Sequence, residues 1–438
     1  MDPLTLGAVV ALCTIFVLFS GVSVALGLLI VSTGFILMFE GMRSLELLPE
    51  ILFGKLDNFA LLSIPMFIIM GASIASTRAG AELYEALERW LTRVLGGLVI
   101  SNLGACALFA AMSGSSPATC AAIGKMGIPE MRKRGYPDGV AAGSIAAGGT
   151  LGILIPPSVT MIVYGIATEQ SIGRLFLAGV IPGLMLVGLF MIWSLYSTWK
   201  SGDRALLAQG NYTWKERFEI LPRVVPFLFI IIGVLYAMYG GVATPSETAA
   251  VGALLCLLIA MIIYKLWNPK DLWVVLRDST KESVMILFII AAAGVFSYML
   301  SSLFITQSIA AWIGTLDVNP WVLMAAVNVF LLIAGFFLPP VAVILMAAPI
   351  LLPIITTAGF DPIWFAVVLT INMEIGLISP PVGLNLYVIN GIAPDISLKT
   401  ILKGSLPFVA CMVIAIILLC FFPGLATWLP NAVMGVAI

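Results

Sequence analysis

The chain has 438 residues, of which 61% are hydrophobic and only 10% are charged. Its mean hydropathy is +1.14, and a soluble domain this apolar could not cover its surface with polar groups. The composition therefore predicts an all-α polytopic membrane protein. The absence of histidine excludes histidine-based nucleophile activation, metal ligation and proton relays. A net charge of −1 argues against nucleic acid as a partner.

Residues 1–199 form the first of two units that we expect. Apolar runs long enough to cross a bilayer, about 20 residues each, alternate with short polar breaks. In chain order we predict two spans within Thr5–Phe39 that divide near Gly21, a span at Phe59–Ser76, an amphipathic interfacial helix at Gly80–Leu95, a re-entrant hairpin at about 98–129 with its tip at Ser113–Pro117, a helix at 136–168 broken at Pro156-Pro157, and a closing span at Leu175–Trp199.

A polar linker at residues 200–223 leads to the second unit, residues 224–438, which repeats the plan of the first. Its predicted elements are spans at Val224–Gly240 and Thr248–Tyr264, an amphipathic stretch at Asp271–Ser283, a span at Val284–Leu303, a hairpin at about 321–355 broken at Pro339-Pro340, a broken helix at 363–390, and a last span at Leu406–Phe422.

The two units share a motif at a fixed spacing. Gly152–Pro157, which reads Gly-Ile-Leu-Ile-Pro-Pro, is followed 224 positions later by Gly376–Pro381, which reads Gly-Leu-Ile-Ser-Pro-Pro. The residues that match are mostly glycine and proline, which determine backbone geometry. Both copies lie inside apolar stretches, so we expect one broken transmembrane helix in each half, a pattern typical of secondary transporters.

Basic residues indicate how each hairpin enters the membrane. Residues 132–134 beside the first hairpin read Arg-Lys-Arg, and the linker is also rich in lysine and arginine, so both are expected to be cytoplasmic. The polar stretches beside the second hairpin contain only Asp317 and Asp361 as charged residues. The first hairpin therefore opens to the cytoplasm and the second to the outside. The halves are predicted to be inverted-topology repeats, with both termini outside.

Each proline pair removes backbone hydrogen bonds from its helix. Pro156 leaves the carbonyl of Gly152 without its helical donor, and Pro157 does the same to Ile153. In hydrocarbon such groups cost several kcal/mol each unless something satisfies them. A dehydrated sodium ion is one candidate, and helix ends directed into the site would add amides for an anionic substrate. The alternative, a structural kink held by neighbouring helices, stays open.

Glu374 is the one carboxylate inside a predicted span, where a charge is expensive and usually functional. It could be protonated, line a water-filled cavity or pair with a lysine. Its counterpart in the first half is Thr150, so it is not a duplicated ligand. Glu247 lies near an outer membrane edge, and we expect it to cap the N-terminus of a helix.

Four motifs in order resemble the large membrane (M) subunit of tripartite ATP-independent periplasmic (TRAP) transporters. They are Ser113–Thr119, Gly152–Ser158, Gly241–Glu247 and Gly376–Leu386, and the resemblance covers essentially the whole chain. It implies a multi-pass elevator-type importer of the bacterial inner membrane that is driven by sodium. It further implies two partners, a small membrane (Q) subunit and a periplasmic substrate-binding (P) protein. Substrates of the family are organic acids, among which we favour a C4-dicarboxylate.

The resemblance also implies site residues. Sodium ligands map onto hairpin-tip and broken-helix positions: Ser115, Ser116, Gly152, Ile155 and Pro157 in the first half, and Gly376, Ser379 and Pro381 in the second. The candidate substrate residues are Ser113, Gly114, Thr119, Thr150, Pro156, Pro340, Glu374, Pro380, Gly383 and Asn385. One departure is that the second tip, Phe337–Val341, lacks the hydroxyl and glycine cluster of the first.

Two other classes of function remain for comparison. A stand-alone sodium/anion symporter or antiporter of related elevator fold would not need a binding protein. An intramembrane enzyme is disfavoured, because no histidine exists to activate a serine in Gly114–Ser116 and no His-Glu-x-x-His metal motif occurs. We expect no organic cofactor, with Na⁺ as the coupling ion. No nucleotide-binding loop is present, so ATP does not power the chain directly.

Overall fold

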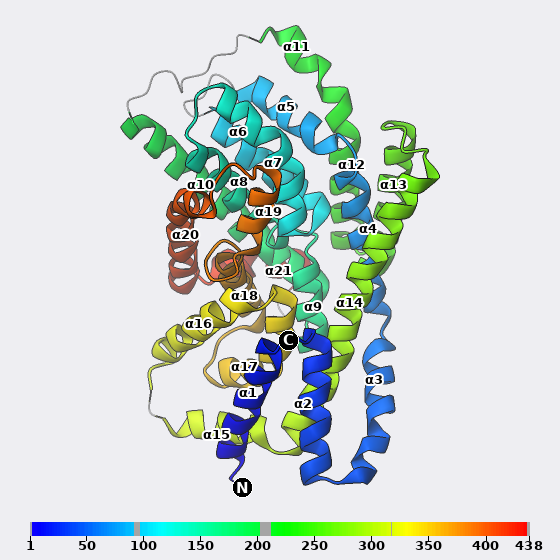
Figure 1. The fold of residues 1–438 in the computed structure, drawn as a ribbon, viewed down its shortest axis with the longest axis vertical. Coiled ribbons are helices and arrows are strands. Elements are labelled where there is room, and N and C mark those ends of the chain that lie inside the picture. Colours follow the sequence, from blue (N-terminus) through cyan, green and yellow to red (C-terminus); the bar gives the residue numbers. More distant parts are fainter. Residues whose placement is uncertain (1, 92–96, 202–211, 317, 436–438) are drawn as a thin grey trace.

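The computed structural model of the chain describes residues 2–91, 97–201, 212–316 and 318–435. Throughout these ranges the regular elements are helices, as Figure 1 shows. Seven helices are long and apolar enough to cross a membrane, and an eighth span is possible if Met42–Leu56 and Phe59–Ala75, bent by 60°, count as one. The prediction of an all-α polytopic membrane protein is confirmed.

The first half contains ten α-helices and three short 3₁₀ helices within the described residues. Gly21, whose φ is +86°, separates the first two helices at the predicted position. The bounds are α1 (Pro3–Phe19), α2 (Val24–Phe39), η1 (Met42–Leu47), α3 (Leu48–Leu56), η2 (Phe59–Leu62), α4 (Ser63–Ala75), α5 (Ala79–Leu91), α6 (Gly97–Ser113), α7 (Ser116–Lys133), α8 (Asp138–Thr150), η3 (Leu151–Ile153), α9 (Val159–Thr168) and α10 (Ile172–Ser201).

In the second half, helices α16 to α20 follow the order of α6 to α10. Its helices α17 and α18 begin 224 positions after α7 and α8, the same spacing as the sequence motif. The bounds are α11 (Trp214–Glu219), α12 (Leu221–Tyr239), α13 (Pro245–Ile262), α14 (Pro269–Ser302), α15 (Ile305–Thr315), α16 (Pro320–Phe337), α17 (Pro340–Thr357), α18 (Pro362–Leu377), α19 (Leu384–Ile392), α20 (Leu398–Phe421) and α21 (Gly424–Met434).

Two predictions about these elements need correction. The amphipathic stretch at 271–283 and the span at 284–303 form one continuous 34-residue helix, α14, because nothing between them breaks the backbone hydrogen bonding. Helices α3, α11, α15 and α21 were not predicted, since at 6 to 11 residues they are too short to be recognised as spans. Residues 92–96 of the expected interfacial helix and 202–211 of the expected linker lie outside the described residues. The domain boundaries at 199 and 223 stay predictions.

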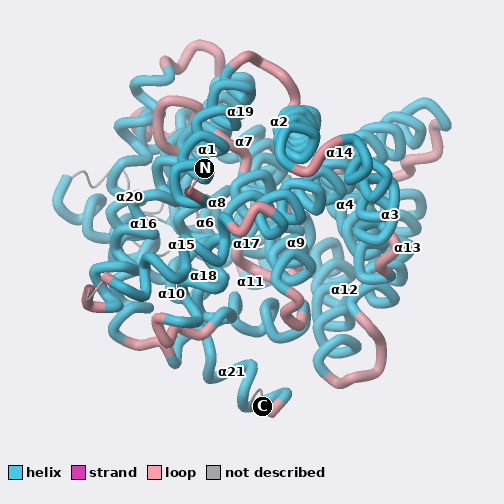
Figure 2. Tube along the Cα trace, turned by 90° about the horizontal axis from the view of Figure 1, so that it is seen from below, coloured by secondary structure: helices cyan, strands magenta, loops and turns pink. Residues whose placement is uncertain are grey.

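The helices form two groups that pack side by side. In the outer group, α2, α3 and α4 pack against α14, and α13 packs against α4 and α12. In the hairpin group, α7 and α20 pack against α8, and α18 packs against α16 and α10. Figure 2 shows the outer group on one side of the molecule and most of the hairpin group on the other. The hairpins α6–α7 and α16–α17 lie in opposite halves of the long axis (Figure 1).

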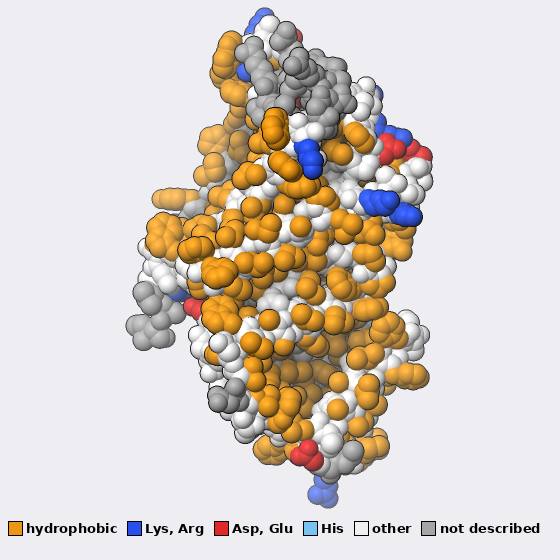
Figure 3. Space-filling view, turned by 90° about the vertical axis from the view of Figure 1, so that its left-hand side faces the viewer, with side chains coloured by type: hydrophobic (Ala, Val, Ile, Leu, Met, Phe, Trp, Pro, Cys, Tyr) orange, Lys and Arg blue, Asp and Glu red, His pale blue; other side chains and the backbone are white. Residues whose placement is uncertain are grey.

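The surface agrees with a bilayer environment. Figure 3 shows apolar side chains over the middle of one face, with lysine, arginine and acidic side chains mainly toward the two ends. Large apolar side chains such as Phe229, Ile232 and Tyr236 of α12 are exposed. Exposed apolar surface on this scale would be unfavourable in water, but it is favourable in contact with the hydrocarbon chains of lipid.

Helices α8 and α20 approach so closely that only glycine fits between them. A Cβ atom built on Gly404 would lie 1.7 Å from the carbonyl oxygen of Gly139, and one on Gly143 would lie 2.2 Å from the carbonyl carbon of Gly404. Such contacts are impossible, so a methyl group at either position would force the backbones apart. Small residues allow this close packing in membrane proteins.

We therefore expect Gly143→Ala to destabilise the protein by about 1–3 kcal/mol, the usual penalty for overpacking a core. The measurement is thermal unfolding of the purified protein in detergent. Gly391→Ala is the matched control, because a Cβ atom at Gly391 meets nothing within 4 Å. Equal melting temperatures for the two variants would contradict the close approach of α8 and α20.

Candidate functional site

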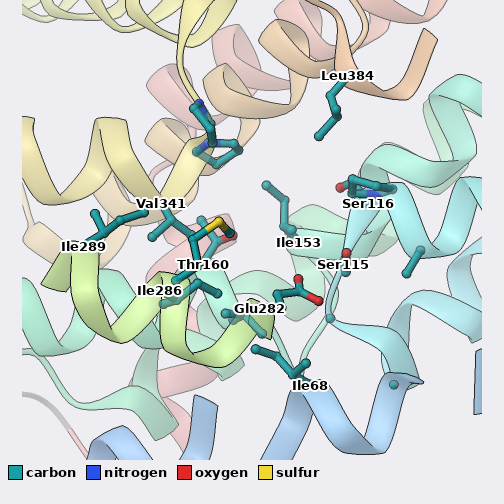
Figure 4. A pocket seen from close by; sticks show the side chains of 18 of the residues that line it. Ile68, Ser115, Ser116, Ile153, Thr160, Glu282, Ile286, Ile289, Val341 and Leu384 are labelled. Atoms are coloured by element: carbon teal, nitrogen blue, oxygen red, sulfur yellow. The ribbon is translucent and has the colours of Figure 1, made fainter. Parts of the chain in front are cut away.

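A cavity of about 420 Å³ lies between the outer group and the hairpin group, a size suited to a small organic molecule. Both hairpin tips reach it: residues 113–118 from the first hairpin and 339–341 from the second. The outer group contributes residues of α2, α4 and α14, among them Ala25, Gly71 and Ile286. Figure 4 shows Ser115, Ser116, Val341 and Leu384 around one space, with Ile286 near Val341 and the Glu282 carboxylate near Ser115. Segments more than 200 positions apart in the sequence therefore share one cavity.

The first turns of several helices line this cavity. They belong to α7 through Ser116, to α9 through Val159, to α17 through Pro340 and to α19 through Leu384. The first amides of a helix lack intrahelical partners and carry a partial positive charge. Four helix starts around one cavity make its hairpin side favourable for a negatively charged ligand.

The first hairpin tip rests directly on the first helix break. A Cβ atom on Gly152 would lie 2.6 Å from the Ser115 carbonyl oxygen and 2.8 Å from the Ser116 nitrogen. Gly114 has a φ of +58°, and a Cβ atom there would lie 2.8 Å from the Pro157 carbonyl oxygen. The two glycines thus allow backbone-to-backbone contact. This contact brings together four of the predicted sodium ligands, Ser115, Ser116, Gly152 and Pro157.

The second hairpin meets the second break in a corresponding way. A Cβ atom on Gly376 would lie 2.3 Å from the Gly335 carbonyl oxygen. The Val382 amide donates a hydrogen bond to the Phe336 carbonyl over 3.3 Å. Both breaks contain a cis Pro-Pro peptide bond. The two hairpin–break pairs therefore share a backbone arrangement, although Pro340 replaces the hydroxyl of Ser116.

One carbonyl that the sequence left without a donor is satisfied inside the protein. The Ser158 hydroxyl donates to the Ile153 carbonyl over 2.5 Å, and it also accepts from the Met161 amide over 3.2 Å as the N-cap of α9. This carbonyl therefore does not need an ion. In the second half, the Ser405 hydroxyl lies 3.5 Å from the Ile378 carbonyl.

Glu374 lies behind the first hairpin tip and is 0% exposed. Its Oε1 accepts a hydrogen bond from the Ser116 hydroxyl over 2.8 Å, a contact across 258 positions of sequence. The Ile153 amide also lies close enough to interact with the carboxylate. Its Oε2 has no hydrogen-bond partner. The counterpart Thr150 instead donates to the carbonyl of Ala147 in its own helix over 2.5 Å, so the contact exists in one half only.

The predicted site residues fall into three groups by position. Those that line the cavity are Ser113, Gly114, Ser115, Ser116 and Pro340. Pro380 and Pro381 are exposed, but away from this cavity. The others are buried or partly buried and do not line the cavity: Thr119, Gly152, Thr150, Ile155, Pro156, Pro157, Glu374, Gly376, Ser379, Gly383 and Asn385.

Two of the residues that do not line the cavity, Thr119 and Asn385, form hydrogen bonds inside the protein instead. Thr119 donates to the Ser115 carbonyl over 2.9 Å and lies 2.8 Å from the Ser113 hydroxyl, so it supports the tip from within. The Asn385 side-chain amide donates to the Ala146 carbonyl over 3.4 Å and joins α19 to α8. Their roles in binding stay predictions.

Sequence reasoning missed Glu282, which lines the cavity from α14. The prediction placed it in an interfacial stretch, where a carboxylate needs no explanation. Its spacing to Met285, Ile286 and Ile289 is three, four and seven residues, which is one face of a helix. That pattern could have identified the face only if α14 had been recognised as one continuous helix. The prediction that Glu247 caps a helix agrees with the structure: Thr244 and Glu247 form a capping box at the start of α13.

Comparisons with known proteins agree on a family. The model of the tripartite ATP-independent periplasmic transporter DctM component matches residues 11–425. The C4-dicarboxylate TRAP transporter large permease protein DctM of Pseudomonas aeruginosa is 39% identical over 380 residues, covering 87% of this chain and 88% of that protein. Its namesake in Vibrio cholerae is 36% identical and covers 95% of each. The sialic acid permease SiaM of Vibrio cholerae is 30% identical over 95% of this chain and 97% of its own.

Among solved structures, the YdaH transporter of Alcanivorax borkumensis has a similar fold. Its TM-score is 0.66, and the match covers 95% of this chain and 99% of that one. The sequence identity is 15%, so the likeness concerns the fold alone.

Proposed function

Because the chain belongs to the DctM component family of tripartite ATP-independent periplasmic transporters, we propose that it imports a C4-dicarboxylate with sodium as the coupling ion. The chain is a multi-pass permease of the bacterial inner membrane and not an enzyme. Its broad activity is secondary transport of dicarboxylates or related organic acids. The substrate, the ion and the partners are the proposed part.

The observation that carries the proposal is the single cavity shared by both hairpin tips and four helix starts. A carboxylate of the substrate would accept hydrogen bonds from the Ser116 and Val341 amides at the starts of α7 and α17, since Pro117 and Pro340 have no N–H to donate. The apolar lining suits the carbon chain between two carboxyl groups. Relatives at 36% and 39% identity are named for C4-dicarboxylates, which supports this substrate over the other acids of the family.

Sodium would bind where each hairpin meets its helix break. Sodium is a hard cation that takes oxygen ligands, and the first junction offers the Ser116 hydroxyl, the Glu374 carboxylate and backbone carbonyls. The second junction offers Ser379 and the carbonyls around Gly376. Because the tips touch both the breaks and the cavity, an ion at either junction would hold the tip in the shape that binds substrate.

Transport would follow from movement of the hairpin group against the outer group. The cavity lies between the two groups, so sliding one along the other would carry the site across the membrane. The family assignment also supports two partners, a small membrane subunit and a periplasmic binding protein that delivers the substrate.

Uptake by proteoliposomes tests this proposal. The chain is reconstituted with its small subunit and supplied with radiolabelled succinate and an inward sodium gradient, with and without the binding protein. We expect uptake that requires both sodium and the binding protein. Sodium-driven uptake without the binding protein would instead support the stand-alone symporter. Uptake that does not depend on the sodium gradient would refute sodium as the coupling ion.

A further inference from the structure

Glu282 is the only charged side chain among the described residues that line the cavity. It projects from α14 on the outer-group side, and Figure 4 shows its carboxylate between Ile68 and Ser115, across the space from Leu384. No lysine or arginine lines the cavity with it, and within the described ranges its side chain forms no hydrogen bond or ion pair. An anionic ligand therefore meets a negative charge on one side of its own cavity.

The two sides of the cavity have opposite electrostatic character. The hairpin side presents the starts of α7, α9, α17 and α19, which favour an anion. The side that holds Glu282 favours a cation or a hydrogen-bond donor. A ligand that spans the cavity is therefore oriented, with its carboxylate toward the start of α19, across the space from Glu282, and its other end toward Glu282.

We propose that Glu282 is a specificity-determining residue that accepts a hydrogen-bond donor at the far end of the substrate and disfavours a second ionised carboxylate there. The donor would be a hydroxyl, an amide, an ammonium group or the protonated carboxyl group of a diacid. A C4-dicarboxylate would accordingly bind as its singly charged form. This inference rests on the proposed function, because it assumes that an organic acid occupies this cavity.

The mechanism is the repulsion between like charges at short range. Glu282 is exposed to the cavity. Two carboxylates held face to face there still repel each other, although water weakens the repulsion, and one proton shared between them removes it. An amide at the same place needs no proton, because its N–H donates to the Glu282 carboxylate directly. A methyl ester offers neither charge nor donor and leaves that carboxylate without a partner.

Three ligands of similar size separate these cases: succinate, succinamate and monomethyl succinate. Each has one carboxylate for the hairpin side, and they differ only at the far end. Binding is measured on the purified chain with its small subunit in lipid nanodiscs containing sodium, without the binding protein, so that delivery plays no part. The readout is protection of a cavity thiol, Ala72→Cys, from alkylation, with Ser23→Cys, directly before α2, as an independent reporter.

At pH 7.5 we expect succinamate to protect best in the protein with Glu282, and succinate and monomethyl succinate less well. In Glu282→Gln the repulsion is gone. The concentration of succinate needed for half-maximal protection, divided by that of succinamate, should therefore fall by about tenfold. Glu247→Gln is the matched control, since that carboxylate caps α13 away from the cavity, and its ratio should not change.

If this ratio of protective concentrations is unchanged or higher in Glu282→Gln, the inference is overturned, while the proposed function is left intact. If none of the three acids protects either thiol in any variant, the proposed function itself fails at this cavity, and the inference falls with it.

Discussion

Replacing Glu374 by glutamine is expected to raise the sodium concentration for half-maximal uptake by a factor on the order of 100, because a buried unit charge close to the ion is removed. Glutamine has nearly the same shape, and its carbonyl oxygen still accepts from the Ser116 hydroxyl. The substitution therefore separates the charge of Glu374 from its structural contact. The measurement is initial uptake into proteoliposomes against sodium concentration.

The reason lies in the surroundings of the carboxylate. It is fully buried, and only one of its oxygens has a hydrogen-bond partner. An ionised carboxylate in such a place is strongly destabilised unless a positive charge lies nearby. No lysine or arginine side chain forms an ion pair with it within the described residues, and the adjacent first junction is where sodium is proposed.

Two further variants make this result decisive. Glu374→Leu removes the acceptor as well, so the Ser116 hydroxyl loses its partner in a dry site at a cost of about 1–3 kcal/mol, and uptake should be lost at every sodium concentration. Glu247→Gln, a capping carboxylate, should leave the sodium dependence unchanged. If Glu374→Gln behaves like the unsubstituted protein, the glutamate is protonated and does not face the ion.

Gly152→Ala is expected to lower uptake by about 100-fold, because displacement of catalytic or binding groups by about 1 Å has effects of this size. The new methyl group would lie 2.6 Å from the Ser115 carbonyl oxygen and 2.8 Å from the Ser116 nitrogen. Both neighbours are backbone atoms, which cannot rotate aside as a side chain does. The first hairpin tip must therefore lift from the break, and the cavity and the first ion junction change together.

The matched control is Gly188→Ala in α10, where a Cβ atom meets nothing within 4 Å. It tests whether alanine in a membrane helix is harmful in itself, and its uptake should equal that of the unsubstituted protein. Gly376→Ala at the second break, whose Cβ atom would lie 2.3 Å from the Gly335 carbonyl oxygen, should repeat the effect. Normal uptake in both Gly152→Ala and Gly376→Ala would show that the tips need not rest on the breaks.

The backbone of the site was predictable from local residue types. Glycine at 114 and the Pro-Pro pairs at 156 and 380 interrupt helices for steric reasons that act within a few residues. The first hairpin tip lies where the sequence placed it, between α6 and α7, and the chain breaks between α8 and α9 and between α18 and α19. The sequence repeat of 224 positions likewise reappears in the helix starts.

The side-chain partners were not predictable, because they depend on how distant segments are placed. The bond between Ser116 and Glu374 spans 258 positions, and pairing by the repeat would have suggested Thr150 as an equivalent that does not take part. The Ile153 carbonyl is satisfied by Ser158 rather than by an ion, a choice that depends on the path of the loop after the break. Continuity of α14 also decided that Glu282 faces the cavity rather than the membrane surface.

The sequence by itself therefore determined the membrane class, the two repeated units and the positions of hairpins and breaks, since hydropathy and the sterics of glycine and proline act locally. The tertiary structure alone decided that both tips meet in one cavity, that Glu374 supports only the first tip, and that Glu282 faces the site. The physical reason is that burial and hydrogen bonding between segments hundreds of positions apart depend on packing, and no local pattern encodes that packing.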